Sequence, residues 1–353
     1  MDPLTQAVLG GGLAQAVCHR RLGRAALICG AVGGVFPDVD VFFSANQWEA
    51  WANHRGITHS LFFPAVASPA LGLALWGIAS VWRRFRSDDA PPPLAGYIWA
   101  TFLGMMTHAL LDFMTPYGTQ LLAPFSNHRF AVNGISIIDP IYTLPLLAAL
   151  IYGWSRRRDP VRVRGAAVAA LLFAQAYLGL NCLINLHVER VARDQLAAEG
   201  VPPGTEVMAY PTIFQGLLRR VVVWQPDAIR VGFYTVLNGQ TIRWRSFPRA
   251  DNPLQHTFLR SDVGQLFHWF SMGRLSFIVR RDGDATALEV WDIRYGLPDF
   301  PRKGMWGVEA LYDDAGRPLA EPRPIRIDRT SNLGQNLIRL WWGVIGDARG
   351  GFH

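Results

Sequence analysis

Histidine and aspartate recur in three short segments of the first third of the chain, in types and spacings that suit a divalent metal ion. The segments are PDVD, HRGITHS and HALLD, and they supply six candidate ligands: Asp38, Asp40, His54, His59, His108 and Asp112. His108 and Asp112 are four residues apart, so a helix would place both side chains on one face. Zinc accepts imidazole nitrogens and carboxylate oxygens as ligands. The chemistry expected of such a set is metal-assisted hydrolysis.

The first two segments leave the role of each residue open. Asp38 and Asp40 are two residues apart, so one can bind metal while the other orients a ligand or accepts a proton. His54 and His59 are five apart and cannot share a helix face, but a turn at Gly56 can direct both inward. Asp38 and His59 are therefore catalytic candidates as well as candidate ligands.

Arg55, between the two histidines, is the third catalytic candidate. Its guanidinium can hold a phosphate through two parallel hydrogen bonds. Arg129 offers the same chemistry, and both arginines are expected on the outer side of the membrane. The alternative for both is contact with lipid headgroups. His187 and Glu189 form a separate candidate for a second metal centre.

Long apolar runs surround these segments. Half of the residues are hydrophobic and 17% are charged, whereas about a quarter are charged in an average soluble domain. Six apolar runs precede residue 188, at positions 4–17, 25–36, 60–82, 94–111, 135–154 and 165–186. Runs of such length and composition predict membrane helices. Residues 1–187 are therefore predicted to form a mainly α, polytopic membrane domain of about six helices.

Arginine clusters separate alternate runs, at residues 20–24, 83–86 and 156–164. If all six runs cross the membrane, these clusters share one side, and the positive-inside rule makes that side cytoplasmic. The candidate ligands then lie together on the other side, where polar groups at membrane depth face a cavity or one another. A multi-pass location in the bacterial cytoplasmic (inner) membrane is predicted. The arginines form no basic stripe, so no nucleic-acid partner is expected, and the oligomeric state is left open.

The composition changes after residue 187. Residues 188–203 predict an amphipathic linker helix that ends at a Pro-Pro-Gly boundary. Residues 204–330 contain short runs such as RRVVVW and ALEVW, separated by NGQ and RDGD turns, and predict an extracytoplasmic antiparallel β domain. The amphipathic tail at 331–353 is expected to lie on the bilayer surface or to pack against the sheet. The three cysteines, an odd number in apolar runs, are expected to be buried thiols.

The motifs of the first half resemble those of a known family. MDPLTQAVLGG, PDVD, HRGITHS, HALLD, TPYGTQLLAPF and IIDP occur in the order and spacing of the YdjM-like membrane-bound metal-dependent hydrolases. That family is distantly similar to zinc-dependent phospholipase C, whose site pattern is matched by Asp40, His54, His108 and Asp112. Asp38 and His59 match motifs of the membrane family itself. Gln6 stands where the family usually has histidine, which puts a second, N-terminal metal in doubt.

The resemblance implies a divalent metal cofactor, with zinc as the first choice, and a metal-dependent hydrolase at the outer face of the cytoplasmic membrane. Its expected substrate is a membrane lipid or another amphipathic phosphoester or ester. The alternative is a non-enzymatic protein, either a metal-stabilised membrane scaffold or a metal-ion transporter. A transporter is expected to carry ionisable groups near the bilayer midplane, whereas here they gather at one end of the helices.

Overall fold

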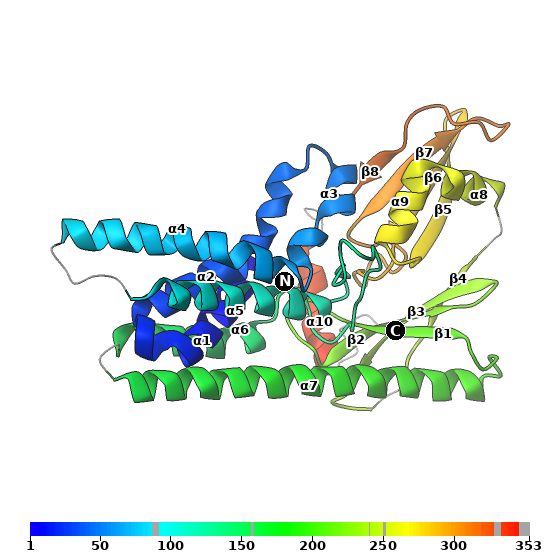
Figure 1. Ribbon diagram of the computed structural model, residues 1–353. Coiled ribbons are helices and arrows are strands. Elements are labelled where there is room, and N and C mark those ends of the chain that lie inside the picture. The colour runs from blue at the N-terminus through cyan, green and yellow to red at the C-terminus, as the bar shows by residue number, and fades with distance from the viewer. Residues whose placement is uncertain (87–91, 157–158, 240, 250–251, 328–332, 346–353) are drawn as a thin grey trace. The chain divides into compact units, whose positions relative to one another are not determined.

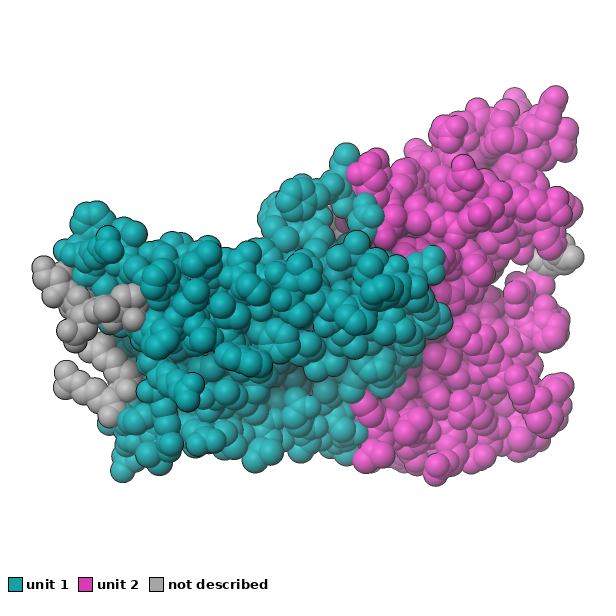
Figure 2. Space-filling view, viewed as in Figure 1, with its two compact units in different colours: residues 1–45, 53–180 teal, residues 46–52, 181–353 magenta. Residues whose placement is uncertain are grey.

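The protein is represented by a computed structural model that describes residues 1–86, 92–156, 159–239, 241–249, 252–327 and 333–345. It divides into two compact units (Figure 2): residues 1–45 and 53–180 form the first, and residues 46–52 and 181–353 form the second. The first unit is helical, and the second contains antiparallel sheets (Figure 1). The predicted helical N-terminal part and C-terminal antiparallel β domain are confirmed. The side of the membrane that the second unit occupies stays a prediction.

Each of the six predicted apolar runs coincides with a helix. These helices are α1 (Pro3–Leu22), α2 (Arg24–Val35), α4 (Phe63–Phe85), α5 (Leu94–Phe113), α6 (Pro140–Ser155) and α7 (Pro160–Ala198). Among the described residues, four stretches are long and apolar enough to cross a membrane: Arg24–Phe43, Phe63–Phe85, Leu94–Phe113 and Pro160–Ala198. The α6 helix is apolar but shorter. A membrane domain is supported, and the count of six spans stays a prediction.

The helices that carry the candidate ligands approach closely at glycines. A Cβ atom added to Gly104 of α5 would lie 2.3 Å from the Gly30 carbonyl oxygen of α2, and one added to Gly10 of α1 would lie 2.4 Å from the same oxygen. A Cβ atom on Gly34 would lie 2.4 Å from the Gln6 carbonyl oxygen. Small residues allow such backbone contact between membrane helices. The three helices therefore meet next to Gln6, Gly34 and the turn of α5 that carries His108.

Two short 3-10 helices complete the ligand-bearing part of the first unit. The η1 helix (Phe36–Phe43) continues directly from α2 and carries Asp38 and Asp40, while η2 (Ile57–His59) precedes α4 and ends at His59. Pro37 at the start of η1 suits a helix N-terminus because its missing N–H would have no intrahelical partner there. Both aspartates thus lie near the end of the stretch Arg24–Phe43, formed by α2 and η1, which is long and apolar enough to cross a membrane.

The second unit contains two four-stranded antiparallel sheets. The first has the order β1 (Glu206–Pro211), β2 (Leu218–Trp224), β3 (Ala228–Thr235) and β4 (Arg245–Pro248). The second has the order β5 (Leu275–Asp282), β6 (Ala285–Asp292), β7 (Gly307–Tyr312) and β8 (Arg323–Ile325). Helices α8 (Pro253–Arg260), α9 (Asp262–Phe270) and α10 (Leu333–Val344) accompany them. The sequence predicted one small sheet, and the structure has two.

The α7 helix is continuous over 39 residues. Its second part packs Val188, Ala192 and Leu196 against Val207 and Val221 of the first sheet. The predicted linker helix at residues 188–203 is therefore the end of α7 rather than a separate element, and the units divide at residue 181 rather than 188.

Helix α3 (Gln47–Asn53) is inserted between ligand-bearing segments, yet residues 46–52 belong to the second unit. Trp51 is 1% exposed, with its ring centroid 4.8 Å from that of Phe267 and 5.2 Å from that of Phe270, both in α9. Because the partners lie more than 200 positions away in the sequence, nothing in the local pattern around Trp51 could predict this packing.

Candidate metal centre

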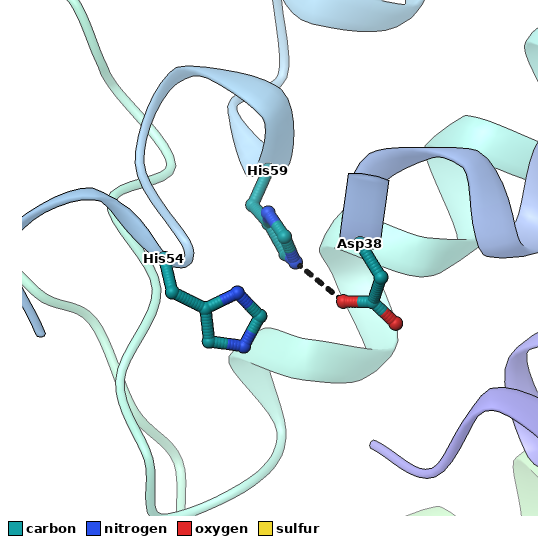
Figure 3. A group of neighbouring side chains, drawn as sticks. All are labelled: Asp38, His54 and His59. Carbon is teal, nitrogen blue, oxygen red and sulfur yellow. Dashed lines mark hydrogen bonds and ion pairs between the residues drawn. The ribbon is translucent and has the colours of Figure 1, made fainter. Parts of the chain in front are cut away.

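Asp38, His59 and His108 converge from η1, η2 and α5. Asp38 Oδ1 lies 3.3 Å from His59 Nε2 and 3.5 Å from His108 Nε2. Figure 3 shows the Asp38 carboxylate directed at the His59 ring, with His54 alongside. Ligand atoms held roughly 2.0–2.1 Å from a tetrahedral zinc ion are separated by about 3.3 Å. The distances from Asp38 Oδ1 to both histidine nitrogens are close to this separation.

The His108 ring has a defined orientation. Its Nδ1 lies 2.6 Å from the Gly34 carbonyl oxygen, which can only accept, so Nδ1 carries a proton and Nε2 is the atom that faces Asp38 and Asp112. His108 is fully buried, and its Nε2 has no hydrogen-bond partner among the described residues. Two carboxylate oxygens, Asp38 Oδ1 and Asp112 Oδ2, lie 3.5 and 3.6 Å from this nitrogen. The position of Nε2 among these carboxylates and His59 fits a metal ligand, with Gly34 as the group that orients the ring.

His54 is held by Asp40. His54 Nδ1 lies 2.8 Å from Asp40 Oδ1, while Asp40 Oδ2 accepts hydrogen bonds from the Thr58 hydroxyl at 2.8 Å and the Arg55 amide at 3.3 Å. Burial lowers the pKa of His54, with Asp40 acting in the opposite direction. One set of atoms spaced for a metal joins His54 with Asp38 and His59. Neither such set among the described residues includes Asp40, which contacts His54 Nδ1 through Oδ1 and lies 3.3 Å from His59 Nδ1 through Oδ2.

Asp112 belongs to a second possible ligand set, with His59 and His108. Its Oδ2 lies 3.5 Å from His59 Nε2 and 3.6 Å from His108 Nε2. The same oxygen lies 2.9 Å from Arg55 Nε, without the alignment of a hydrogen bond. On the other side, Oδ1 accepts a hydrogen bond of 2.9 Å from the Gln6 amide and contacts the amino group of Met1. Asp112 is thus shared between the histidines and two cationic groups.

Arg55 and Arg129 are buried, each 4% exposed. Arg55 donates to the Thr115 hydroxyl at 2.8 Å, and its guanidinium lies 4.3 Å from the centre of the Tyr117 ring. Arg129 stacks on the same ring at 5.3 Å and donates to the Gly118 carbonyl. The backbone of Arg55 has φ 64°, and this left-handed turn directs its side chain inward.

Several residues that the sequence did not single out support the site. They are Thr58, Thr115, Tyr117 and the carbonyl group of Gly34. Gln6, considered only as a lost ligand, donates to Asp112. Thr115 and Tyr117 belong to the TPYG motif, which the sequence shows. Their contacts with Arg55 depend on the left-handed backbone conformation of Arg55, which residue types do not predict.

Three other residues of metal-ligand type, His128 and the candidates His187 and Glu189, are not part of either ligand set found among the described residues. His128 is exposed and packs against Phe130 at 4.5 Å between ring centroids. In the second unit, His187 packs against Tyr234, while Glu189 accepts hydrogen bonds from Asn185 and Arg193. Neither of the two ligand sets found among the described residues includes His187 or Glu189.

Comparison with known proteins assigns the helical part to a family. An uncharacterized protein, YfhP of Bacillus subtilis (strain 168), is 29% identical over 161 residues, which cover 42% of this chain and 45% of the relative. This chain therefore matches less than half of that relative. No solved structure matches. The model of the family described as YdjM inner membrane protein matches residues 1–185, more than half of the sequence. The chain belongs to the YdjM inner membrane protein family.

Proposed function

We propose that the protein is a metal-dependent hydrolase that acts on a phosphoester or lipid-linked ester at the extracytoplasmic face of the inner membrane. The observation that carries the proposal is the arrangement of Asp38, His59 and His108. Asp38 Oδ1 lies 3.3 Å from His59 Nε2 and 3.5 Å from His108 Nε2, and His59 is shared by the two ligand sets found among the described residues, one with Asp38 and His54 and one with His108 and Asp112. Asp38, His59 and His108 would hold a divalent ion, with zinc as first choice, and the ion would supply the Lewis acidity needed to activate a water and polarise the ester.

The side chains around this cluster divide the remaining tasks. The Asp38 side chain is 21% exposed, whereas those of His59 and His108 are fully buried. Asp38 Oδ2, the oxygen that does not contact the histidines, can therefore accept a proton from an entering water. His54, oriented by Asp40, completes the donor set on the η2 side. Arg55 is a positioning residue in this proposal, because it is held against Asp112 and Thr115 instead of being free to bind a phosphate on its own.

Exposed aromatic side chains support an amphipathic substrate. Phe42 and Phe43 follow Asp40 in η1 and are 82% and 79% exposed. Phe125 is 80% exposed and packs edge-on against Phe62, near the start of α4. Aromatic residues are favoured at the membrane–water interface. Substrate carried in the membrane would meet these side chains on its way to the ligands.

The second candidate is a metal-stabilised scaffold without activity. The contacts of Asp112 with Gln6 and Arg55 favour it, because they link α1, the segment before η2 and α5 through one buried carboxylate. Such a network stabilises the fold whether or not chemistry takes place. Metal binding alone therefore does not separate the two candidates, and activity must be measured as well.

The test compares His108→Ala with His128→Ala in the purified, detergent-solubilised protein. Zinc content is measured alongside hydrolysis of a panel that contains a phosphodiester, a phosphomonoester and a phospholipid. His108→Ala should lose bound zinc and all zinc-dependent hydrolysis, whereas the exposed His128→Ala should retain both. Full zinc binding by a correctly folded His108→Ala protein would remove the proposed site. Zinc binding by the parent protein with no turnover of any ester would favour the scaffold.

A further inference from the structure

The α10 helix has two apolar faces. On one face, Leu340 and Val344 are 4% and 6% exposed and pack with Leu218 of β2. On the other, Ile338, Trp341 and Ile345 are 58%, 66% and 50% exposed. Spacings of three and four residues align these three side chains in one stripe. Packing against the sheet therefore accounts for only one face of the helix.

Two further apolar side chains are exposed at the same end of the first sheet. Leu218 of β2 pairs with Thr235 of β3, and the Thr235 hydroxyl donates to the Val344 carbonyl of α10 at 2.6 Å. Leu237, two residues beyond Thr235, is 57% exposed. Phe214, in the turn between β1 and β2, is 41% exposed. We call Phe214, Leu237, Ile338, Trp341 and Ile345 the apolar edge.

The turn that carries Phe214 is held in a strained conformation. Phe214 has φ 71°, a region that bulky residues rarely adopt. The buried Gln215 side chain fixes the turn by accepting hydrogen bonds from the amides of Leu217 at 2.6 Å and Leu218 at 2.8 Å. Strain of this kind persists where the surrounding structure imposes it, often for function. Here it keeps a large aromatic side chain exposed.

The exposed side chains of α7 indicate how deep in the bilayer the apolar edge lies. The exposed positions of α7 in the second unit are apolar at Leu183 and Leu186, then polar at His187, Arg190 and Arg193. In a helix that is a candidate span, this change marks the boundary of the hydrocarbon region near residue 187.

The β1–β2 turn meets α7 on the apolar side of that boundary. Arg219, which follows the turn and is fully buried, donates to the Asn181 carbonyl at 2.8 Å and to its side-chain oxygen at 2.9 Å. Asn181 precedes the boundary by six residues, or about 9 Å of helix. An arginine at this depth in the membrane needs hydrogen-bond acceptors such as the two oxygens of Asn181. Phe214 belongs to the turn that leads into β2 and Arg219.

We propose that the apolar edge is a membrane-contact surface, through which the second unit is immersed in the interfacial zone of the bilayer beside α7. A tryptophan flanked by aliphatic side chains on one helix face suits this zone. The surface is formed entirely by residues of the second unit, so the proposal does not depend on the metal centre or its activity.

Site-directed spin labelling of the full chain tests the proposal. The protein, with Cys18, Cys29 and Cys182 replaced by alanine, is reconstituted into phosphatidylcholine–phosphatidylglycerol vesicles. Labels are attached at Ile338→Cys, Trp341→Cys or Phe214→Cys. The matched control is Leu319→Cys, because Leu319 is also aliphatic and 55% exposed but lies after β7, outside the apolar edge. Power saturation then compares collisions with oxygen, which concentrates in lipid, and with a water-soluble nickel chelate.

Labels on the apolar edge should show an oxygen-to-nickel collision ratio several-fold higher than the Leu319→Cys label. Equal ratios at all four positions would overturn the proposal. Low collision rates with both reagents, together with dipolar broadening that disappears on dilution with unlabelled protein, would instead identify a second copy of the chain as the partner and would also overturn it. Circular dichroism of each labelled protein confirms that the fold is retained.

Discussion

Asp112 shows how one buried carboxylate can serve both binding and stability. Its Oδ2 faces His59, His108 and Arg55, while its Oδ1 accepts a hydrogen bond from Gln6. A buried carboxylate is costly unless it is paired and hydrogen-bonded. Arg55, the amino group of Met1 and the Gln6 amide supply the partners that such a carboxylate needs. Removing it should disturb the fold as well as the candidate ligand set, so it is a poorer probe of metal binding than His108.

Asp40 offers a sharper test at the same scale, because its contact with His54 Nδ1 leads us to propose it as an orienting group. Asp40→Ala should weaken zinc binding by roughly 10–100-fold, the usual effect of losing a carboxylate behind a ligating histidine. Zinc stoichiometry at saturation should be unchanged. Asp40→Asn, which keeps an oxygen acceptor for His54 Nδ1, should recover part of the affinity. Titration with a competing zinc chelator measures both quantities. A loss of stoichiometry in both variants would show that Asp40 is itself a ligand.

Gln6 gives a second residue-scale prediction. Gln6→Met keeps a similar volume but removes the amide that donates to Asp112 at 2.9 Å. Leaving a buried acceptor short of a donor costs about 1–3 kcal/mol, so the free energy of unfolding should fall by that order. Leu4→Met, at an exposed position of the same helix, is the control and should change it little. Unfolding in mixed detergent micelles provides the comparison. Equal stability of the two variants would mean that the Gln6 contact contributes nothing.

Restoring the family residue at this position is a separate prediction. Gln6→His keeps a ring N–H that can donate to Asp112, and imidazole is the better zinc donor. Bound zinc per chain should equal or exceed that of the parent protein in elemental analysis. A clear fall would mean that the glutamine has a packing role that histidine cannot fill.

At the scale of elements, the apolar runs predicted where helices form in the first unit. The three motifs that the sequence analysis grouped lie in η1, in η2 with the turn before it, and in α5, and their side chains contact one another. The i, i+4 spacing of His108 and Asp112 correctly placed both on one face of α5, since both are fully buried there. The inward turn of Arg55 was not predictable, because it depends on a left-handed backbone conformation. The same holds for Trp51, whose aromatic partners in α9 are distant in sequence. The periodicity of a sequence predicts which side chains share one face of a helix. It does not predict which residues, distant in the sequence, pack against that face.

The glycine contacts between α1, α2 and α5 lead to an element-scale prediction. Gly104→Ala places a Cβ atom 2.3 Å from the Gly30 carbonyl oxygen, so α2 and α5 must separate. Because His108 lies one turn further along α5 and is bonded to Gly34 of α2, zinc affinity should fall together with thermal stability. Gly77→Ala in α4, where a Cβ atom meets nothing within 4 Å, is the matched control. It should leave both unchanged or raise stability by about 0.5–1 kcal/mol, because alanine favours a helix. Equal melting temperatures for the two variants would contradict the close packing.

At the scale of the whole molecule, the family match and the unit boundary fall close together. The match ends at residue 185. The second unit begins at residue 181 and also includes residues 46–52. The candidate ligands all belong to the first unit, within the matched part. The family match therefore includes the candidate metal centre. It does not include the β-sheets, so their role has to be inferred from the structure of this chain.

The side of the membrane that holds the candidate metal centre can be predicted from charge. Arginine clusters at 20–24, 83–86 and 156–164 lie at the ends of helices far in sequence from the ligand-bearing ends. Clustered arginine is retained in the cytoplasm, so the ligands and the second unit are expected on the extracytoplasmic side. A fluorescent protein that matures only in the cytoplasm, fused after His353, should stay dark, while alkaline phosphatase at the same position should be active. The same pair of reporters inserted after Arg86 should give the opposite result. A fluorescent fusion at His353 with inactive phosphatase would place the second unit in the cytoplasm, and the candidate metal centre would then have to act on a cytoplasmic substrate.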